Sequence, residues 1–253
     1  MGNRFSVKVK KLRDYLGEFL LIFLAVMAGA ITENYREDYI ERKEVRDYAR
    51  SLVNDLRLDT AEIRNTRTDK LWLAGIYDSA MQIIESGNVE RHPGYLYYAA
   101  RYLTLNNIFN CQDVTFLQLQ GSGNFRYFEN EKIYRQISDY YKLNKRYASL
   151  EGPFGYTDVD EIASITIRLF DQQALHSLDR ADKEVVFSRV VNLQGELPAL
   201  KNDKQALDLF YAALAQARHR SYASANFLLL LNNQAQQLIQ TLNRNFDLVK
   251  FLN

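Results

Sequence analysis

The residue types in one short run, QGSGN at Gln120 to Asn124, come nearest to those of a ligand-binding loop. Glycine-rich turns can direct backbone N–H groups at an anion. This run lacks the Lys-Ser/Thr pair that completes a phosphate-binding loop, and we expect no strand before it. Termination of a helix by Gly121 and Gly123 explains the same residues. Ser122, Gly123 and Asn124 are therefore interpreted as a helix-ending turn, with a ligand loop as the alternative.

Other reactive side chains lack the partners that catalysis or metal binding requires. Ser221 lies two residues from His219 in one expected helix, but no acid partner is evident, so a nucleophilic triad is not expected. The other histidines, His92 and His176, have no second His at i+4. Cys111 is the single cysteine, which excludes an internal disulfide and a multi-thiolate metal site. We expect neither an enzyme nor a bound metal or other cofactor.

The tyrosines are a further candidate for ligand binding. The chain has 17 of them, and many lie in the runs YLYYAARY and SDYYKLNKRY. They could line a ligand cleft. Aromatic residues at helical spacing also form cores, with their hydroxyl groups reaching solvent. We interpret them as core residues, with a ligand cleft as the alternative.

Composition favours helices and argues against nucleic acid as a partner. The chain is 47% hydrophobic with only 11 Gly and 3 Pro, and no segment has the strict alternation of a half-buried strand. Its 32 basic residues are interleaved with 31 acidic ones, for a net charge of +1. The sequence therefore shows no basic patch that would bind the phosphate backbone of nucleic acid. We predict an all-α protein that does not bind nucleic acid.

An uninterrupted apolar run predicts a transmembrane helix. Phe19 to Ile31 contains no polar side chain, and a helix from Tyr15 to Ile31 spans about 25 Å, close to the ~30 Å of a hydrocarbon core. Glu18 lies one turn inside the first end, and Tyr15 and Tyr35 lie where interfacial aromatics occur. Five basic residues come just before the run: Arg4, Lys8, Lys10, Lys11 and Arg13. They predict a cytoplasmic amino terminus, with the rest of the chain on the other side of the membrane.

Two alternatives to an uncleaved anchor remain. Ala28, Gly29 and Ala30 form an A-x-A pattern that a signal peptidase could cleave, and a buried core helix would also be apolar. We favour the anchor because eighteen residues precede Phe19 and because the helical pattern continues through the possible cleavage point. Glu18 is interpreted as an interfacial carboxylate, with proton or ion coupling as the alternative.

The predicted organisation has four parts: a basic cytoplasmic leader (1–14), a transmembrane helix (15–32), a long helix that begins as a stalk and joins a bundle (33–86), and the remaining extracytoplasmic helical bundle (87–253). The long helix has a leaky heptad pattern with polar interruptions at Asp38, Arg42 and Asp59. Gly87 and Asn88 should end it. Further helices are predicted over 93–109, 114–119, 131–150, 158–178 and 181–193, and a last one starts at Asn202 or Asp203 and reaches nearly to the end of the chain.

Two blocks of sequence resemble an uncharacterised bacterial family of single-pass membrane proteins that is known only as a domain of unknown function. They are LGEFLLIFLAVMAGAITENYREDYIERKEVRDYARSLVNDLRLD and TFLQLQGSGNFRYFENEKIYRQISDYY. The residues that match the family pattern are Gly17, Glu18, Tyr48, Leu52, Asp55, Leu56, Ser122, Gly123, Asn124, Tyr140 and Tyr141. Where members often carry Asn-Trp-Asn-Glu after the anchor, this chain has ENYRE. The resemblance implies an uncleaved anchor in the bacterial cytoplasmic (inner) membrane and a helical exterior domain, without an activity.

The function expected from these features is that of a membrane-anchored structural or protein-interaction module. Its partners would be the lipid bilayer and either a second copy or another envelope protein. We predict self-association along one seam of the anchor and stalk, formed by Ala25, Ala28, Gly29, Thr32, Val45, Leu52 and Leu56. The alternative is a ligand-binding sensor bundle, which would act through a membrane partner because its cytoplasmic leader is short.

Overall fold

The computed structural model describes residues 3–128, 130–152, 159–180 and 197–248, with side chains for 15–128, 130–152, 159–178 and 197–248. Within these ranges the chain forms seven α-helices, two short 3₁₀ helices and no strand. The predicted all-helical fold is confirmed for this part of the chain.

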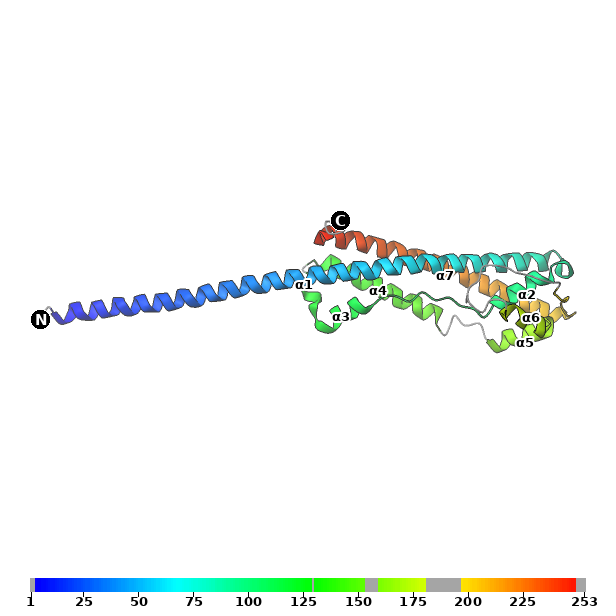
Figure 1. Cartoon of the computed structure of the whole chain (residues 1–253), viewed down its shortest axis with the longest axis horizontal. Coiled ribbons are helices and arrows are strands. Elements are labelled where there is room, and N and C mark those ends of the chain that lie inside the picture. Colours follow the sequence, from blue (N-terminus) through cyan, green and yellow to red (C-terminus); the bar gives the residue numbers. More distant parts are fainter. Residues whose placement is uncertain (1–2, 129, 153–158, 181–196, 249–253) are drawn as a thin grey trace.

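One helix determines the long shape of the molecule. Helix α1 runs without interruption from Asn3 to Glu85, which are 83 residues and about 125 Å at ~1.5 Å per residue. Its first half extends alone, and its second half lies among the other helices (Figure 1). The absence of Pro and Gly between Thr32 and Ala74 allows this length. The helix ends where predicted, because Gly87 adopts a φ of 69° that glycine tolerates without strain.

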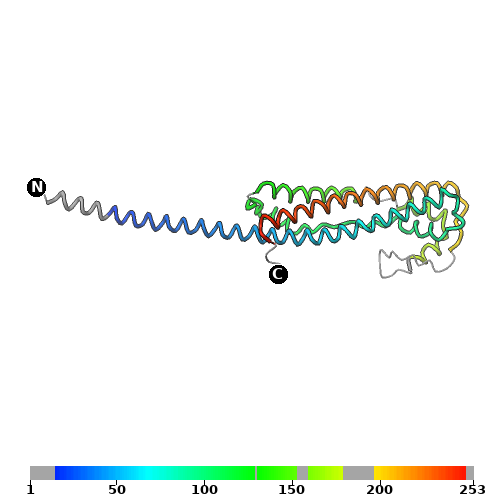
Figure 2. The backbone as a smooth tube through the Cα atoms, turned by 90° about the horizontal axis from the view of Figure 1, so that it is seen from above, coloured from blue at the N-terminus to red at the C-terminus, as the bar shows by residue number. Residues whose placement is uncertain are grey.

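Two further long helices pack beside α1. Helix α7, Lys204–Phe246, runs antiparallel to the second half of α1 and has the most extensive packing with it (Figures 1 and 2). Helix α4, Glu131–Glu151, packs on α7. Both begin at the predicted caps. The Asp203 carboxylate accepts a hydrogen bond from the Ala206 N–H at 2.9 Å, and the Asn130 side chain accepts one from the Lys132 N–H at 3.0 Å.

The short helices occupy the two ends of the packed region. Helices α2 (Pro93–Tyr102), α5 (Val159–Leu169) and α6 (Gln172–Arg180) lie at the end far from the amino terminus, and α3 (Val114–Ser122) lies near the point where α1 enters (Figure 1). The 3₁₀ helices are η1 (Val89–Arg91) and η2 (Asn124–Tyr127). We call α1 from Val45 onward, together with all of these helices, α4 and α7, the helical body.

Two predicted helices differ from the observed ones. The helix from Pro93 stops at Tyr102, and the chain then returns along α1 in a non-helical segment, 103–113. Carboxylates of α1 stabilise that segment, because Glu62 accepts from the Asn110 N–H at 3.2 Å and Asp59 from the Gln112 N–H at 2.8 Å.

The helix predicted over 158–178 is divided in two at Asp171. The Asp171 backbone N–H donates to the Tyr97 hydroxyl at 2.7 Å. The Asp171 carboxylate accepts from the Ala174 N–H at 2.8 Å, and this hydrogen bond caps the start of α6. The helix predicted over 181–193 lies outside the described residues.

The apolar residues of the helical body form two separate cores. The distal core joins the end of α1 to α2, α5 and the first half of α7; it includes Leu73, Tyr77, Ala80, Leu96, Tyr97, Ile165, Phe170, Phe210 and Leu214. The proximal core joins the middle of α1 to α4 and the second half of α7; it includes Val45, Ala49, Leu52, Leu56, Ile63, Phe109, Ile137, Tyr140, Leu228, Leu231, Leu238 and Leu242. A polar layer around Lys70 separates them along α1.

The amino-terminal part of α1 packs against nothing in the described chain. Every residue from Tyr15 to Glu44 is exposed, including Phe19 at 66% and Ile31 at 46%. This helix is long and apolar enough to cross a membrane, and none of its apolar window is buried. Fourteen positions separate Ile31 from Val45, the first buried residue, which corresponds to about 20 Å of exposed helix. We call residues 33–44 the stalk.

Candidate ligand pocket

A cavity of about 240 Å³ lies between the distal and proximal cores. Four parts of the chain line it: α1, the start of the 103–113 segment, the end of α4 and the middle of α7. Its charged lining residues are Lys70, Glu151 and Arg220, and its hydroxyl groups come from Tyr77, Tyr147, Thr104, Ser221 and Ser224. The pocket therefore combines a small number of polar groups with an apolar lining, as small-molecule sites do.

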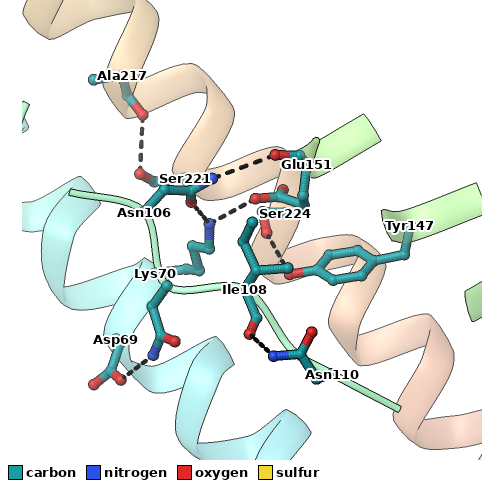
Figure 3. A network of polar contacts seen from close by, with 11 residues as sticks. Asp69, Lys70, Asn106, Ile108, Asn110, Tyr147, Glu151, Ala217, Ser221 and Ser224 are labelled. Carbon is teal, nitrogen blue, oxygen red and sulfur yellow. Dashed lines mark hydrogen bonds and ion pairs between the residues drawn. The ribbon is translucent and has the colours of Figure 1, made fainter. Parts of the chain in front are cut away.

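A buried ion pair forms one side of the pocket. The Lys70 ammonium donates hydrogen bonds to Glu151 Oε2 at 2.7 Å and to Asn106 Oδ1 at 2.5 Å (Figure 3). The side chains of Lys70 and Glu151 are only 5% and 13% exposed. Burial lowers the pKa of Lys70, and the Glu151 carboxylate partly opposes this shift. The pair ties α1, α4 and the 103–113 segment together at the level of the pocket.

Helix α7 supplies the opposite side. The Ser221 hydroxyl donates to the Ala217 carbonyl at 2.9 Å, and Ser224 lies 3.5 Å from the Tyr147 hydroxyl (Figure 3). Burial is the main cause that raises the pKa of Tyr147 to about 12, so this hydroxyl is neutral at physiological pH. Burial also lowers the pKa of Arg220. The lining thus offers hydroxyl donors and two cations beside one carboxylate, a set suited to binding and orienting a polar ligand.

A second polar cluster lies inside the proximal core. Asp59 is completely buried and accepts hydrogen bonds from the Tyr140 hydroxyl at 2.7 Å, the Gln112 N–H at 2.8 Å and the Cys111 thiol at 3.3 Å. Burial raises the pKa of Asp59, against the lowering effect of these donors. Burial first, and then the Asp59 carboxylate, raises the pKa of the Cys111 thiol. The cluster fixes α4 and the 103–113 segment to α1.

The sequence-predicted loop Ser122–Gly123–Asn124 forms a helix-ending turn away from the pocket. Gly123 has a φ of 70° and ends α3. The Asn124 side chain donates to the Tyr48 hydroxyl on α1 at 3.2 Å, and its N–H donates to Ser122 Oγ at 3.3 Å. These contacts favour the structural interpretation of the run over the ligand loop.

The predicted self-association seam is divided between two environments. Val45, Leu52 and Leu56 are 7%, 0% and 0% exposed and belong to the proximal core, so α4 and α7 of the same chain cover the face that we expected a second copy to cover. The prediction that these three side chains contact a second copy is therefore corrected: they contact helices of their own chain. A charge at Leu52 is therefore expected to destabilise the helical body itself.

The amino-terminal half of the predicted seam is not covered by any described part of the chain. Glu18, Ala25, Ala28, Gly29 and Thr32 are exposed, and no atom outside the local helix lies within 4 Å of a Cβ added at Gly29. The Thr32 hydroxyl donates to the Ala28 carbonyl at 2.8 Å, which satisfies it within the helix.

The pocket residues and the predicted reactive residues overlap only in part. Ser221 lines the pocket, whereas His219 is exposed. Most tyrosines of the two runs are buried in the cores, and Tyr147 also lines the cavity. Sequence reasoning missed Lys70, Glu151 and Arg220. The sequence carried no clear signal for Lys70, because it follows the polar run RNTRTD at 64–69 and directly precedes the apolar run LWLAGIY at 71–77.

Comparisons with protein-family models, curated proteins and solved structures found no match for this chain. The resemblance to the uncharacterised bacterial family stays a prediction.

Proposed function

We propose that this chain is a membrane-anchored extracytoplasmic ligand-binding protein that acts through a membrane partner. The observation that carries the proposal is the pocket between the two cores, with its buried Lys70–Glu151 pair and its hydroxyl-bearing wall on α7. The apolar amino-terminal helix supports anchoring, since none of the described residues elsewhere in the chain covers its side chains. The basic leader supports an extracytoplasmic position for the pocket.

The continuity of α1 connects the pocket to the membrane. Lys70 and the apolar segment belong to the same uninterrupted helix, with 39 positions or about 60 Å between Ile31 and Lys70. A ligand that shifts Lys70 relative to α4 and α7 thereby also shifts the rod that enters the lipid. This route fits a sensor whose signal reaches a membrane partner through α1.

A bulky residue at the pocket wall should abolish ligand binding. Ala223 lines the cavity and is exposed, so Ala223→Phe fills space without disturbing a core. We expect some members of a panel of small acids, alcohols and amines to raise the Tm of the detergent-solubilised wild type, because a ligand at 100 times its Kd adds about 2.7 kcal/mol. The same compounds should not raise the Tm of Ala223→Phe.

The matched control is Ala212→Phe, an exposed alanine of α7 that does not line the pocket. It should respond to the panel as the wild type does. If no compound shifts the wild type more than Ala223→Phe, the pocket is not a binding site.

The anchor should be retained in the mature protein. A reporter fused after Asn253 should be active only in its extracytoplasmic form, because the basic residues of the leader stay in the cytoplasm. Mass spectrometry of the membrane-extracted chain should identify peptides from the leader. A mature amino terminus at Ile31 would contradict the anchor and show that the chain is cleaved and exported as a soluble protein.

Self-association in the membrane is a second candidate function, that of the interaction module. It is favoured by the small residues Ala25, Ala28, Gly29 and Thr32, which lie on one uncovered face of the helix. Gly29→Leu should weaken crosslinking between copies in native membranes, because a larger side chain prevents close backbone approach. Ala30→Leu, off this face, should not. Equal crosslinking of both variants would remove the candidate.

A further inference from the structure

The most buried polar groups of the pocket lie on two opposite walls. Lys70 on α1 is 4% exposed, and Ser221 and Ser224 on α7 are 7% and 4% exposed. Lys70 extends from α1 towards the wall that carries the two serines (Figure 3). The pocket therefore has hydrogen-bonding groups on both sides of one small volume.

The charge of Lys70 is already neutralised. Glu151 Oε2 lies 2.7 Å from its ammonium, and both side chains are largely shielded from water. A second charge brought beside this pair would lose its hydration, which is costly. An anion would also meet the Glu151 carboxylate, and a cation would meet the Lys70 ammonium. The pair therefore favours an uncharged ligand.

The two walls offer one donor and one acceptor. The Lys70 ammonium has three N–H donors, and among the described residues Glu151 and Asn106 accept two of them. The Ser221 hydroxyl donates to the Ala217 carbonyl at 2.9 Å, so its oxygen keeps its lone pairs for a donor in the cavity. A carboxamide carries an accepting oxygen and a donating N–H on neighbouring atoms. It can therefore use both walls.

The rest of the lining is apolar and limits the ligand's size. Leu73 and Leu103 are buried in it, whereas Leu150 is 55% exposed and lies where the pocket opens to solvent. The volume of about 240 Å³ exceeds the ~150 Å³ that holds a benzene molecule and lies below the ~300 Å³ at which typical drug-sized sites begin. A ligand of this size has one ring or a short alkyl chain besides its polar group.

We infer that the pocket binds a small uncharged carboxamide, whose carbonyl oxygen accepts from Lys70, whose N–H donates to Ser221 and whose apolar body contacts the leucines. This inference rests on the proposed ligand-binding function and deepens it by assigning the ligand's polar group, charge and size. Arg220 also lines the pocket, but it has an interaction of its own within the protein, so no ligand group is assigned to it.

Four probes of nearly the same shape separate charge from hydrogen bonding: benzamide, benzoate, benzamidine and acetophenone. At pH 7 benzamide and acetophenone are neutral, benzoate is an anion and benzamidine is a cation. Isothermal titration of the full chain in detergent should give benzamide an affinity at least about tenfold above that of either ion. Acetophenone retains the carbonyl but has no N–H, so it should bind about three- to tenfold more weakly than benzamide.

Ser221→Ala removes the acceptor on α7. It should weaken benzamide binding about three- to tenfold and leave acetophenone binding unchanged, which abolishes the preference between the two probes. The matched control is Ser79→Ala, because Ser79 donates to the Gly75 carbonyl at 2.9 Å in the same way but does not line the pocket. Lys70→Met should weaken the binding of both probes about tenfold or more, because each accepts from the ammonium.

The outcomes distinguish this inference from the proposed function. Equal binding of all four probes, lost in Ala223→Phe, would overturn the carboxamide and leave the pocket as a binding site. A preference for benzoate or benzamidine, equal affinities of benzamide and acetophenone, or no benzamide binding up to millimolar concentrations would overturn it as well. If Lys70→Met does not fold, the wild-type ranking of the four probes and the effect of Ser221→Ala decide.

Discussion

Asp59→Ala is expected to lower the free energy of unfolding of the helical body by about 3–5 kcal/mol. The substitution removes the acceptor of the Tyr140 hydroxyl and the Gln112 N–H, which then lie buried without a partner. Each such group costs about 1–3 kcal/mol. The substitution also removes one of the contacts that hold the 103–113 segment to α1, and that segment supplies part of the pocket wall. Urea unfolding of the detergent-solubilised chain, followed by circular dichroism, measures the change.

Two variants control this result. Asp47→Ala removes an exposed carboxylate of the same helix, which pairs with Arg50 at 3.1 Å, and should cost less than about 0.5 kcal/mol. Asp59→Asn retains an acceptor and the side-chain volume but removes the charge. Equal stabilities of Asp59→Ala and Asp47→Ala would contradict the role of Asp59.

Asp59→Asn also tests the pKa of this carboxyl. Burial raises the pKa of Asp59 above its unfolded value of about 3.9, so the folded chain holds the proton more tightly than the unfolded chain does. The resulting stability is fully present below that value and is lost as pH rises through the folded pKa. The wild type should therefore lose stability relative to Asp59→Asn as pH is raised from about 4 towards neutrality.

The second large effect is expected at the buried ion pair. Glu151→Leu should lower the free energy of unfolding by about 3–5 kcal/mol, because it removes the carboxylate that neutralises Lys70 and leaves the buried ammonium with the neutral Asn106 side chain as an acceptor. Lys70→Met should be destabilising for the converse reason, though less so, since Glu151 is the more exposed partner. The double variant should lie within about 1 kcal/mol of the wild type, because apolar residues replace a pair whose dehydration is itself costly.

A surface pair provides the comparison for this cycle. Glu131 and Arg135 are 2.6 Å apart and more than two-thirds exposed. Arg135→Met should change stability by less than about 1 kcal/mol. Additive losses in the Lys70→Met/Glu151→Leu double variant would show that the two buried residues act independently.

Local sequence signals predicted the helices well where a cap or a breaker determines an end. Gly87, Asn130 and Asp203 each act as the sequence indicated. The 103–113 segment was not predicted, because its backbone is stabilised by Asp59 and Glu62, which lie more than 40 positions earlier in the chain. Periodicity alone does not report such long-range partners.

The same limit explains the seam and the pocket. The spacing of Val45, Leu52 and Leu56 indicated a buried stripe, but spacing cannot tell whether a second copy or the same chain covers it. Lys70 and Glu151 are 81 positions apart, so their pairing depends on how α4 and α1 pack. Each residue alone has the character of ordinary solvated charge, and only the tertiary arrangement brings the pair together.

Because the stalk is uninterrupted, the number of its residues determines the orientation of the pocket about the axis of α1 relative to the apolar segment. Each residue of an α-helix turns the chain by about 100° and advances it by ~1.5 Å. One residue inserted between Ile31 and Val45 would thus rotate the whole helical body by more than a quarter of a circle while raising it by less than the width of an atom. Seven inserted residues would lift it by about 10 Å and return it to nearly the same heading. A partner that contacts one side of the helical body would still meet the same surface after an insertion of seven residues. It would no longer meet that surface after an insertion of one residue.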